Sequence, residues 1–232
     1  MKIYGISDLH LSFQSDKPMD VFYGWDNHVE RIKANWLRLV EKDDIVVLPG
    51  DFSWALKLND TQKDFQFLDS LPGKKLIIKG NHDLWWSTSK KIYEFWKENN
   101  INTVDIVFNS MYKVGNFAIC GSRGWFSEKE SEQLIVKREA GRLKMSLSKA
   151  RDENLTPLVF LHYPVVYAEQ VMKPIIEVLK EFDIKKVYHG HIHGSGINHY
   201  IREYDGISFK LLSCDCCDFT PYFIQDVENE KK

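Results

Sequence analysis

Three histidines at alternate positions could place several imidazole rings side by side. His189, His191 and His193 lie in YHGHIHGSG, which runs from residue 188 to residue 196. An extended backbone sends side chains i and i+2 to the same side, so the three rings can face one way. The glycines between and after them let the chain turn sharply. The pattern fits a metal site, a catalytic loop or a polar turn, and these nine residues do not distinguish the three.

Acidic, amide and histidine side chains also follow four earlier β-branched runs. Ligand sites in open α/β sheets form at the carboxyl ends of strands, so we expect these side chains to converge. Each motif alone is explained by a helix cap, a turn or a satisfied core histidine. Together with His191 and His193, they offer more ligands than one ion needs and suit two ions of Mn, Fe, Zn, Co or Ni that share a carboxylate. The positions are Asp8 and His10 after residues 3–6, Asp51 after 45–48, Asn81, His82 and Asp83 after 76–78, and His162 after 158–161.

The elements that position these residues alternate between strand and helix patterns. Helical spacing of apolar residues occurs over 29–39, 136–147 and 172–182, the second within a predicted helix at 127–151. This alternation predicts an α/β domain with a buried central sheet. Consecutive strands predicted at 104–108 and 111–118, and paired strands over 197–212, indicate that part of the sheet is mixed or doubled. We expect one domain over 1–232, because no linker or repeat interrupts the chain.

Composition narrows the classes of partner. The chain of 232 residues has 31 basic and 33 acidic residues and a net charge of −2, which gives no support for broad binding to nucleic acid or anionic lipid. The first residues, MKIYGISDLHLS, lack the apolar region of a signal peptide, and no apolar run is long enough to span a bilayer. We therefore expect a cytoplasmic protein with no membrane partner. The oligomeric state is left open.

Three cysteines crowd together near the C-terminus. Cys214, Cys216 and Cys217 lie in SCDCCDF, a spacing that suits no usual disulfide framework. A closed thiolate metal site usually gathers two separated pairs, and the sequence has no second pair. We expect reduced thiols at the end of a strand.

The order DxH … GD … GNHD … H … GHxH closely resembles the calcineurin-like metallophosphoesterase superfamily. All five blocks occur in order between Asp8 and His193, and GDFSW and GNHDLWW are similar to a bacterial group of predicted phosphohydrolases. The resemblance implies an αββα architecture, which is a two-sheet β-sandwich flanked by helices with a metal site at the carboxyl ends of the strands.

The resemblance also implies two divalent metal ions as cofactors. Two cations about 3.5–4 Å apart can activate a bridging water, neutralise phosphate oxygens and clamp an in-line displacement. We expect a phosphomonoesterase or phosphodiesterase for a small phosphate-ester substrate, in which a metal-bridging hydroxide attacks phosphorus. The implied ligands are Asp8, His10 and His193 for the first ion, Asn81, His162 and His191 for the second, and Asp51 for both.

His82 is left over from this ligand set. By resemblance it faces the substrate, where it would protonate the leaving group or stabilise charge on the phosphoryl group. Asp83 would orient that ring or hold its loop. Trp54 stands where phosphoprotein phosphatases of the family have the second aspartate of GDxxDRG. The aspartate that pairs with the catalytic histidine in that branch is therefore missing here, which disfavours a protein phosphatase.

Arg123 is the candidate for substrate binding outside the motifs. It lies in GSRGW, and a guanidinium fork suits phosphate oxygens, although a surface ion pair is the alternative. Four tryptophans near the motifs could wall a pocket or simply pack: Trp54, Trp85, Trp86 and Trp125. His189 matches no ligand of the family and is expected within a strand or beside the ligands.

Two other functions stay open. A nuclease of the same superfamily is disfavoured by the balanced charge and by the lack of a basic stretch interleaved with aromatic residues. A catalytically silent metal-binding scaffold would be expected to lose ligands or His82, and all of these positions are filled.

Overall fold

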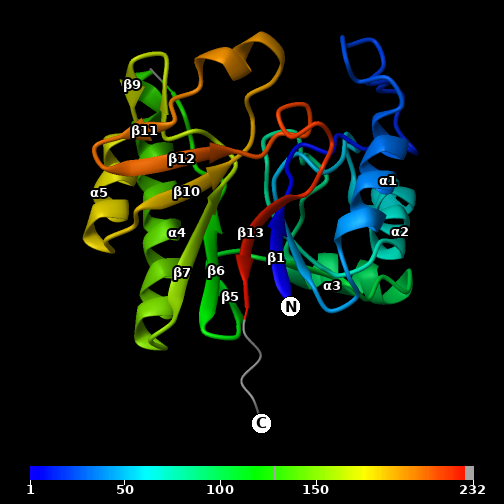
Figure 1. Cartoon of the computed structure of the whole chain (residues 1–232), viewed down its shortest axis with the longest axis horizontal. Coiled ribbons are helices and arrows are strands. Elements are labelled where there is room, and N and C mark those ends of the chain that lie inside the picture. Colours follow the sequence, from blue (N-terminus) through cyan, green and yellow to red (C-terminus); the bar gives the residue numbers. More distant parts are fainter. Residues whose placement is uncertain (128, 228–232) are drawn as a thin grey trace.

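The computed structural model describes residues 1–127 and 129–227. Within these residues, a five-stranded and a six-stranded sheet pack face to face, and helices cover the outer face of each (Figure 1). The expected αββα architecture is confirmed. Because each sheet is covered on both faces, its strands are mostly apolar along their whole length.

The first sheet is built from strands that alternate with helices. Its order is β13-β1-β2-β3-β4, and β13 runs antiparallel to its neighbour while the other strands are parallel. Its strands are β1 (Lys2–Gly5), β2 (Ile45–Pro49), β3 (Lys74–Ile78), β4 (Val104–Ile106) and β13 (Tyr222–Asp226). The connections contain α1 (His28–Leu39), the 3₁₀ helix η1 (Leu58–Thr61), α2 (Gln62–Ser70) and α3 (Ser89–Glu98).

The second sheet has a parallel centre and antiparallel edges. Its order is β11-β12-β10-β7-β6-β5, from β5 (Met111–Val114), β6 (Phe117–Ser122), β7 (Thr156–Leu161), β10 (Lys186–His189), β11 (Glu203–Tyr204) and β12 (Ile207–Leu211). The connections contain η2 (Glu130–Glu132), α4 (Gln133–Asp152), the hairpin β8 (Val166–Tyr167) and β9 (Gln170–Val171), α5 (Lys173–Glu181) and η3 (Gly194–His199).

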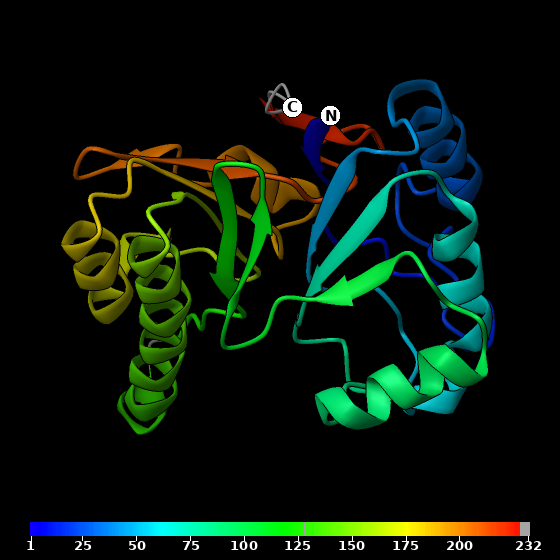
Figure 2. The same ribbon diagram turned by 90° about the horizontal axis from the view of Figure 1, so that it is seen from below.

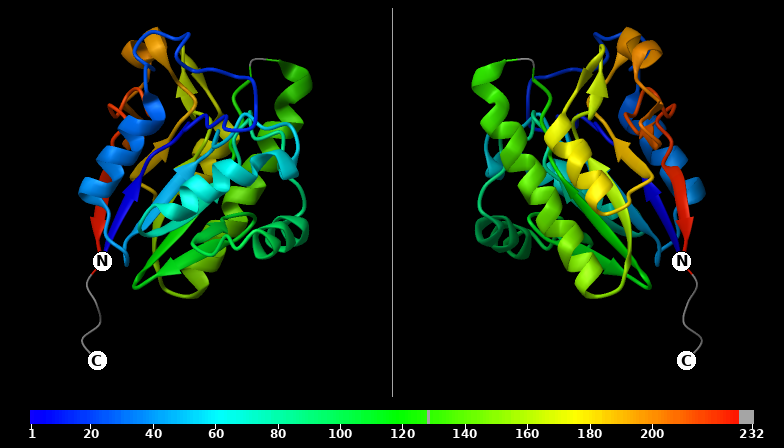
Figure 3. Two further views of the ribbon diagram at one scale, coloured as in Figure 1. Left: turned by 90° about the vertical axis from the view of Figure 1, so that its right-hand side faces the viewer. Right: turned by 90° about the vertical axis from the view of Figure 1, so that its left-hand side faces the viewer.

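The helices divide between the two outer faces. Figure 2 shows the sheets facing each other with helices only on the outside. In Figure 3, α1, α2 and α3 lie in front in the left view, and α4 and α5 lie in front in the right view. The sandwich therefore has three buried layers, one between the sheets and one beneath each set of helices.

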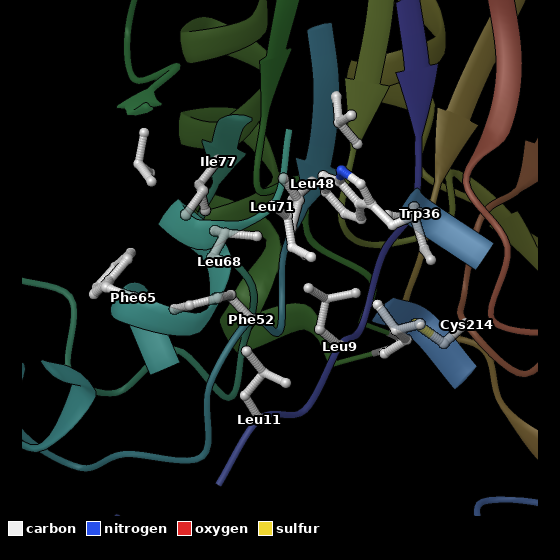
Figure 4. Close-up of a cluster of buried hydrophobic side chains, with 14 of the residues drawn as sticks. Leu9, Leu11, Trp36, Leu48, Phe52, Phe65, Leu68, Leu71, Ile77 and Cys214 are labelled. Carbon is white, nitrogen blue, oxygen red and sulfur yellow. The ribbon is translucent and has the colours of Figure 1, made fainter. Parts of the chain in front are cut away.

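Alternation along the strands assigns side chains to these layers. In β2, Ile45 and Val47 pack between the sheets, while Val46 and Leu48 pack beneath the helices. Figure 4 shows the helix-side cluster of the first sheet, where Leu48 lies among Trp36 and other apolar side chains. Burial of each such side chain contributes about 1.5–3 kcal/mol.

Two strand predictions were wrong in detail. Residues 111–118 form a hairpin rather than one strand, because Gly115 adopts a φ of 57° and Val114 pairs with Phe117 across a two-residue turn. The paired strands expected over 197–212 begin only at Glu203, since Gly194–His199 forms a 3₁₀ helix. Strand β13 was not predicted from the sequence, because it is short and much of it is exposed.

Two helices also differ from expectation. The helix expected from residue 127 begins at Gln133. Position 128 lies outside the described residues. Helix α2 was not predicted, because Asp64 interrupts its apolar stripe of Phe65 and Leu68. The structure buries this carboxyl group against Ser53 and the backbone N–H of Phe13.

Candidate metal centre

The loops that follow the central strands of both sheets meet at one end of the sandwich, opposite the N-terminus (Figure 1). Strand-like hydrogen bonds continue past the strand ends. In the first sheet, Asp8 N donates to Gly50 O and His10 N donates to Asp51 O, both at 3.0 Å. In the second, Gly190 N donates to His162 O at 3.1 Å. These bonds fix the loops side by side, so the motifs are held in register with one another.

Four of the candidate ligands have an unusual backbone. Asp8, His10, Asp51 and His191 have φ values of 60°, 47°, 51° and 74°. Residues with a side chain rarely adopt this left-handed region, and such conformations cluster at functional sites. The bends turn the four side chains toward one centre.

Glycines permit the close approach of these loops. A Cβ atom on Gly80 would clash with the Asp51 carboxylate, and one on Gly190 would clash with Ser7 and the Asp8 carboxylate. Any larger residue at either position would displace a candidate ligand. The glycines of GNHD and GHIH are therefore required by packing around the site.

The first group of converging side chains consists of Asp8, His10 and His193. One potential ligand atom from each lies within 4.8 Å of the others. His193 Nε2 is 3.1 Å from Asp8 Oδ1, and the Asp8 carboxylate also accepts hydrogen bonds from the Ser213 hydroxyl and the His191 backbone N–H. Asp8 and His10 follow a strand of the first sheet, and His193 follows a strand of the second.

The second group consists of Asp51, His162 and His191, under the same 4.8 Å limit. His162 Nδ1 is 3.0 Å from Pro49 O, which assigns the ring proton to Nδ1 and leaves Nε2 free to bind a cation. The amide oxygen of Asn81 lies 2.6 Å from His162 Nε2 and 2.8 Å from His191 Nδ1. This group also takes side chains from both sheets.

Burial and neighbouring carboxylates set the protonation of these side chains. It lowers the pKa of His10 and of His191 to about 3, so both rings are neutral. Burial also raises the pKa of Asp51 to about 9, and the nearby Asp8 and Asp83 carboxylates add to this effect. For His193, burial acts in the opposite direction, but the carboxylates of Asp8 and Asp215 raise the pKa to about 10.

These groups fit divalent cations. The neutral imidazoles of His10 and His191 can donate lone pairs, and a nearby cation would favour the ionised form of the Asp51 carboxyl group, whose pKa is raised. His10 Nδ1 is buried with no hydrogen-bond partner among the described residues. Buried polar atoms are normally hydrogen-bonded, so this nitrogen is a candidate to bind a cation instead. The mixture of oxygen and imidazole donors suits borderline divalent metals.

His82 lies at the edge of both groups without joining either. Its backbone N–H donates to Asp51 Oδ1 at 2.7 Å, and its ring lies 4.3 Å from the Trp54 ring. Trp54 also stacks on His10 at 4.7 Å. Within residues 1–127 and 129–227, no carboxylate is hydrogen-bonded to the His82 ring. The tryptophan that replaces the GDxxD aspartate is thus itself the neighbour of this histidine.

Asp83 is fully buried and binds backbone rather than the His82 ring. Its carboxylate accepts hydrogen bonds from Asp51 N at 3.0 Å, Phe52 N at 2.9 Å and Gly80 N at 2.7 Å. It also accepts one from Trp85 Nε1 at 3.0 Å. Of the two roles expected for Asp83, these contacts fit the holding of the loop.

The remaining sequence candidates lie in different parts of the structure, and one of them, Trp54, lines the cavity beside the candidate ligands. Trp54 lines a cavity of about 900 Å³ with His10, His82 and His193, whereas Arg123 and Trp86 line a different cavity of about 680 Å³. Trp85 is buried in the helix-side core, and the Trp125 ring packs against Tyr163. His189 is buried at the end of β10, where its Nδ1 lies 3.0 Å from Gly190 O.

Asp215 is a functional candidate that sequence reasoning missed. Its Oδ1 lies 2.9 Å from His193 Nδ1, and its Oδ2 accepts a hydrogen bond from Gly194 N at 2.9 Å. It therefore fixes the ring so that Nε2 faces Asp8. A carboxylate bound to the outer nitrogen of a ligating histidine orients the ring and raises its basicity. The available signal was its position just after β12.

Asp215→Asn is expected to weaken binding of one metal ion about 10- to 100-fold, because the ring loses its orienting charge. Metal titration followed by calorimetry measures this effect. Asp218→Asn, an exposed aspartate in the same turn, is the matched control and should leave the affinity unchanged. Equal affinities in both variants would remove the positioning role of Asp215.

The cysteines lie in the same turn. All three thiols are free, Cys214 is buried, and Cys216 and Cys217 are partly buried. In the part of the chain that the structure describes, the groups able to hold a metal contain no cysteine. The thiols thus follow a strand end, as expected.

Comparison with known proteins agrees with this geometry. Residues 1–195 match the model of the calcineurin-like phosphoesterase family. The chain belongs to this family.

Two solved structures share the fold. The protein TT1561 of Thermus thermophilus has a TM-score of 0.57 and 13% identity, and the match covers 95% of this chain and 96% of that chain. A protein of unknown function from Aquifex aeolicus, AQ665, has a TM-score of 0.55 and 17% identity, with 96% and 95% covered. No curated protein matches the chain. In the described residues, no helix is both long enough and apolar enough to cross a bilayer.

Proposed function

We propose that the protein hydrolyses phosphate esters with the help of two divalent metal ions. The observation that carries the proposal is the pair of converging groups, Asp8-His10-His193 and Asp51-His162-His191, with the imidazole of His82 beside them. Membership of the calcineurin-like phosphoesterase family supports it. When bound, the two cations would acidify a water molecule and neutralise phosphate oxygens.

The side chains divide between the two ions. Asp8, His10 and His193 would hold the first. Asn81, His162 and His191 would hold the second. Asp51 would contribute to both, because its carboxylate is 3.4 Å from His162 in the second group and close enough to Asp8 in the first for the Asp8 carboxylate to raise the pKa of Asp51. Asp83 would keep the Asp51 and Asn81 loops together.

His82 would act on the substrate. Its ring lines the 900 Å³ cavity together with His10 and His193, so a phosphoryl group at the metal centre would meet it there. Burial and the neighbouring His162 lower the pKa of His82, which favours the neutral ring before substrate binds. A neutral imidazole donates a hydrogen bond to a phosphoryl oxygen, and a protonated one transfers a proton to the leaving group.

The same cavity favours esters with an apolar or aromatic leaving group. Five aromatic residues line it beyond the histidines: Phe22, Tyr23, Trp25, Trp54 and Phe219. The side chains of Phe22 and Tyr23 are 55% and 105% exposed, so they are free to cover a substrate. Aromatic side chains contribute large contact areas and stacking.

Tyr23→Ala is expected to raise KM for naphthyl phosphate about five- to tenfold without changing kcat, because the residue would contact the leaving group and not the phosphorus. Steady-state kinetics measure this, with methyl phosphate as the substrate that lacks a ring. Val21→Ala is the control, since it is 70% exposed in the same segment but does not line the cavity. An equal rise in KM for methyl phosphate would contradict the assignment.

One panel tests the proposed function. Purified protein loaded with Mn, Fe, Ni, Zn or Co is assayed on p-nitrophenyl phosphate, bis-p-nitrophenyl phosphate, cyclic nucleotides and single-stranded DNA. Hydrolysis of the small esters is expected. Activity on DNA alone would indicate a nuclease, and metal binding without any activity would indicate a silent scaffold. The single domain and cytoplasmic location inferred from the sequence stay predictions.

A further inference from the structure

A second cavity, of about 680 Å³, lies where β3 and β6 end beside α4. Four basic side chains line it: Lys79, Arg123, Arg138 and Arg142. The only acidic side chain among the described lining residues is Glu139. Within residues 1–127 and 129–227, this cavity shares no lining residue with the one that contains His82.

Glu139 leaves the cavity with an unused acceptor. The residue is fully buried, and its Oε1 is 2.6 Å from Arg142 Nη1 and 3.9 Å from Arg123 Nη2. Its other oxygen, Oε2, has no hydrogen-bond partner among the described residues. A buried polar atom without a partner destabilises the fold, because it has lost its hydrogen bonds to water without replacing them. A ligand that donates a hydrogen bond to Oε2 would remove this cost.

Arg123 adds an unused donor. Its Nε is buried and also has no partner in the described part of the chain. Its guanidinium group lies 4.6 Å from the Trp125 ring, which limits its movement. A fixed cation, an unsatisfied N–H and an unsatisfied carboxylate oxygen therefore lie together at one wall of the cavity.

The start of α3 also lines the cavity. Ser87 and Thr88 line the cavity, and Thr88 is the N-cap of this ten-residue helix. The amino end of a helix carries partial positive charge and favours anions. Positive groups from three separate elements, α3, α4 and the end of β3, thus line one cavity.

We propose that this cavity binds a small phosphorylated molecule that also carries a hydroxyl group. Lys79, Arg138, Arg142 and the start of α3 would hold the phosphate, and Glu139 Oε2 would accept the hydroxyl hydrogen. Arginine forks suit phosphate oxygens, and the buried carboxylate selects for a donor that phosphate alone lacks. Among the described residues, the cavity shares no lining residue with the one at the metal centre, so the proposal does not rest on the proposed hydrolysis.

Isothermal titration tests this with two phosphonates that cannot be hydrolysed as esters. The probes are 3-hydroxypropylphosphonate, which has the hydroxyl group, and propylphosphonate, which lacks it. Both are titrated into metal-loaded protein and into protein treated with a chelator. Binding of the hydroxylated probe is expected to survive chelation and to be about two- to tenfold tighter than binding of the other probe.

Arg138→Glu is the decisive variant, because its exposed side chain can be changed without disturbing the core. Its Kd for the hydroxylated probe is expected to rise at least about tenfold. Lys137→Glu makes the same charge change at the adjacent exposed position, which does not line the cavity, and should change Kd less than about twofold.

Three results would overturn the proposal. The first is loss of all phosphonate binding on chelation, which would assign the binding to the metal centre. The second is an equal Kd in Arg138→Glu and wild type. The third is equal affinity for the two probes, which would remove the role of Glu139.

Discussion

Asp51→Asn is expected to abolish the dimetal centre and to lower turnover more than about 100-fold, beyond the range of a residue that only orients a ligand. The substitution keeps the shape of the side chain and an oxygen to accept the His82 N–H. It removes the negative charge that two cations would share. Metal content by mass spectrometry and turnover of p-nitrophenyl phosphate measure the result.

A thermal signature separates this effect from misfolding. Burial raises the pKa of Asp51 to about 9 in the cation-free protein, from an ordinary value of 3.8. A folded-state pKa above the unfolded value means that stability present at low pH is lost as pH rises through that window. Without metal at neutral pH, Asp51→Asn should therefore have a Tm equal to or above that of the wild type. Added metal should raise Tm only in the wild type.

Asp64→Asn serves as the control for Asp51, because it changes another buried carboxyl group, one bound to Ser53 and away from both groups. This control should keep two metal ions. If Asp51→Asn retained both ions and its activity, the shared role of Asp51 would be wrong.

His82→Gln is expected to leave both metals bound and to reduce kcat about 10²- to 10⁴-fold on esters with alkyl leaving groups. The reason is that an amide donates hydrogen bonds but cannot transfer a proton. Its effect on an activated aryl ester separates the two roles. A much smaller loss there would indicate proton transfer to the leaving group, whereas equal losses on both would indicate stabilisation of the phosphoryl oxygens.

The controls for His82 are His28→Gln and metal analysis. His28 packs against Trp25, 5.5 Å between ring centroids, and belongs to neither metal group. Full activity of His82→Gln on alkyl esters would exclude any catalytic role for this ring. Loss of metal in that variant would instead make His82 part of the centre.

From the sequence, the convergence of the candidate ligands could be predicted, whereas the contacts that orient them could not. Asp8, His10, Asp51 and the later histidines could be recognised because each follows a strand-like run, and parallel strands bring their carboxyl ends together. Asp215 was missed although it also follows a strand, β12. It lies in a cysteine-rich turn, and its role follows from a contact with His193 that only the packing of η3 against the β12 turn creates.

The surroundings of Arg123 and Trp54 also could not be predicted from the sequence. The arginine was expected near the substrate from its residue type, but β6 and α4 place it in a separate cavity beside Glu139. Trp54 was recognised as a departure from a motif, and only the structure shows its ring beside both His10 and His82. Likewise, the turn at Gly115 depends on one residue within an otherwise continuous strand pattern.

Each of the two side-chain groups draws on both sheets, with Asp8 and His10 against His193 in one and Asp51 against His162 and His191 in the other. An ion in either position would therefore cross-link the two sheets at the carboxyl ends of their central strands, as a disulfide cross-links two segments of a chain. Metal supply would then act on folding as well as on chemistry, because binding to the native state alone stabilises it by mass action. A cell short of the metal would hold less of the folded protein, and not only a less active one.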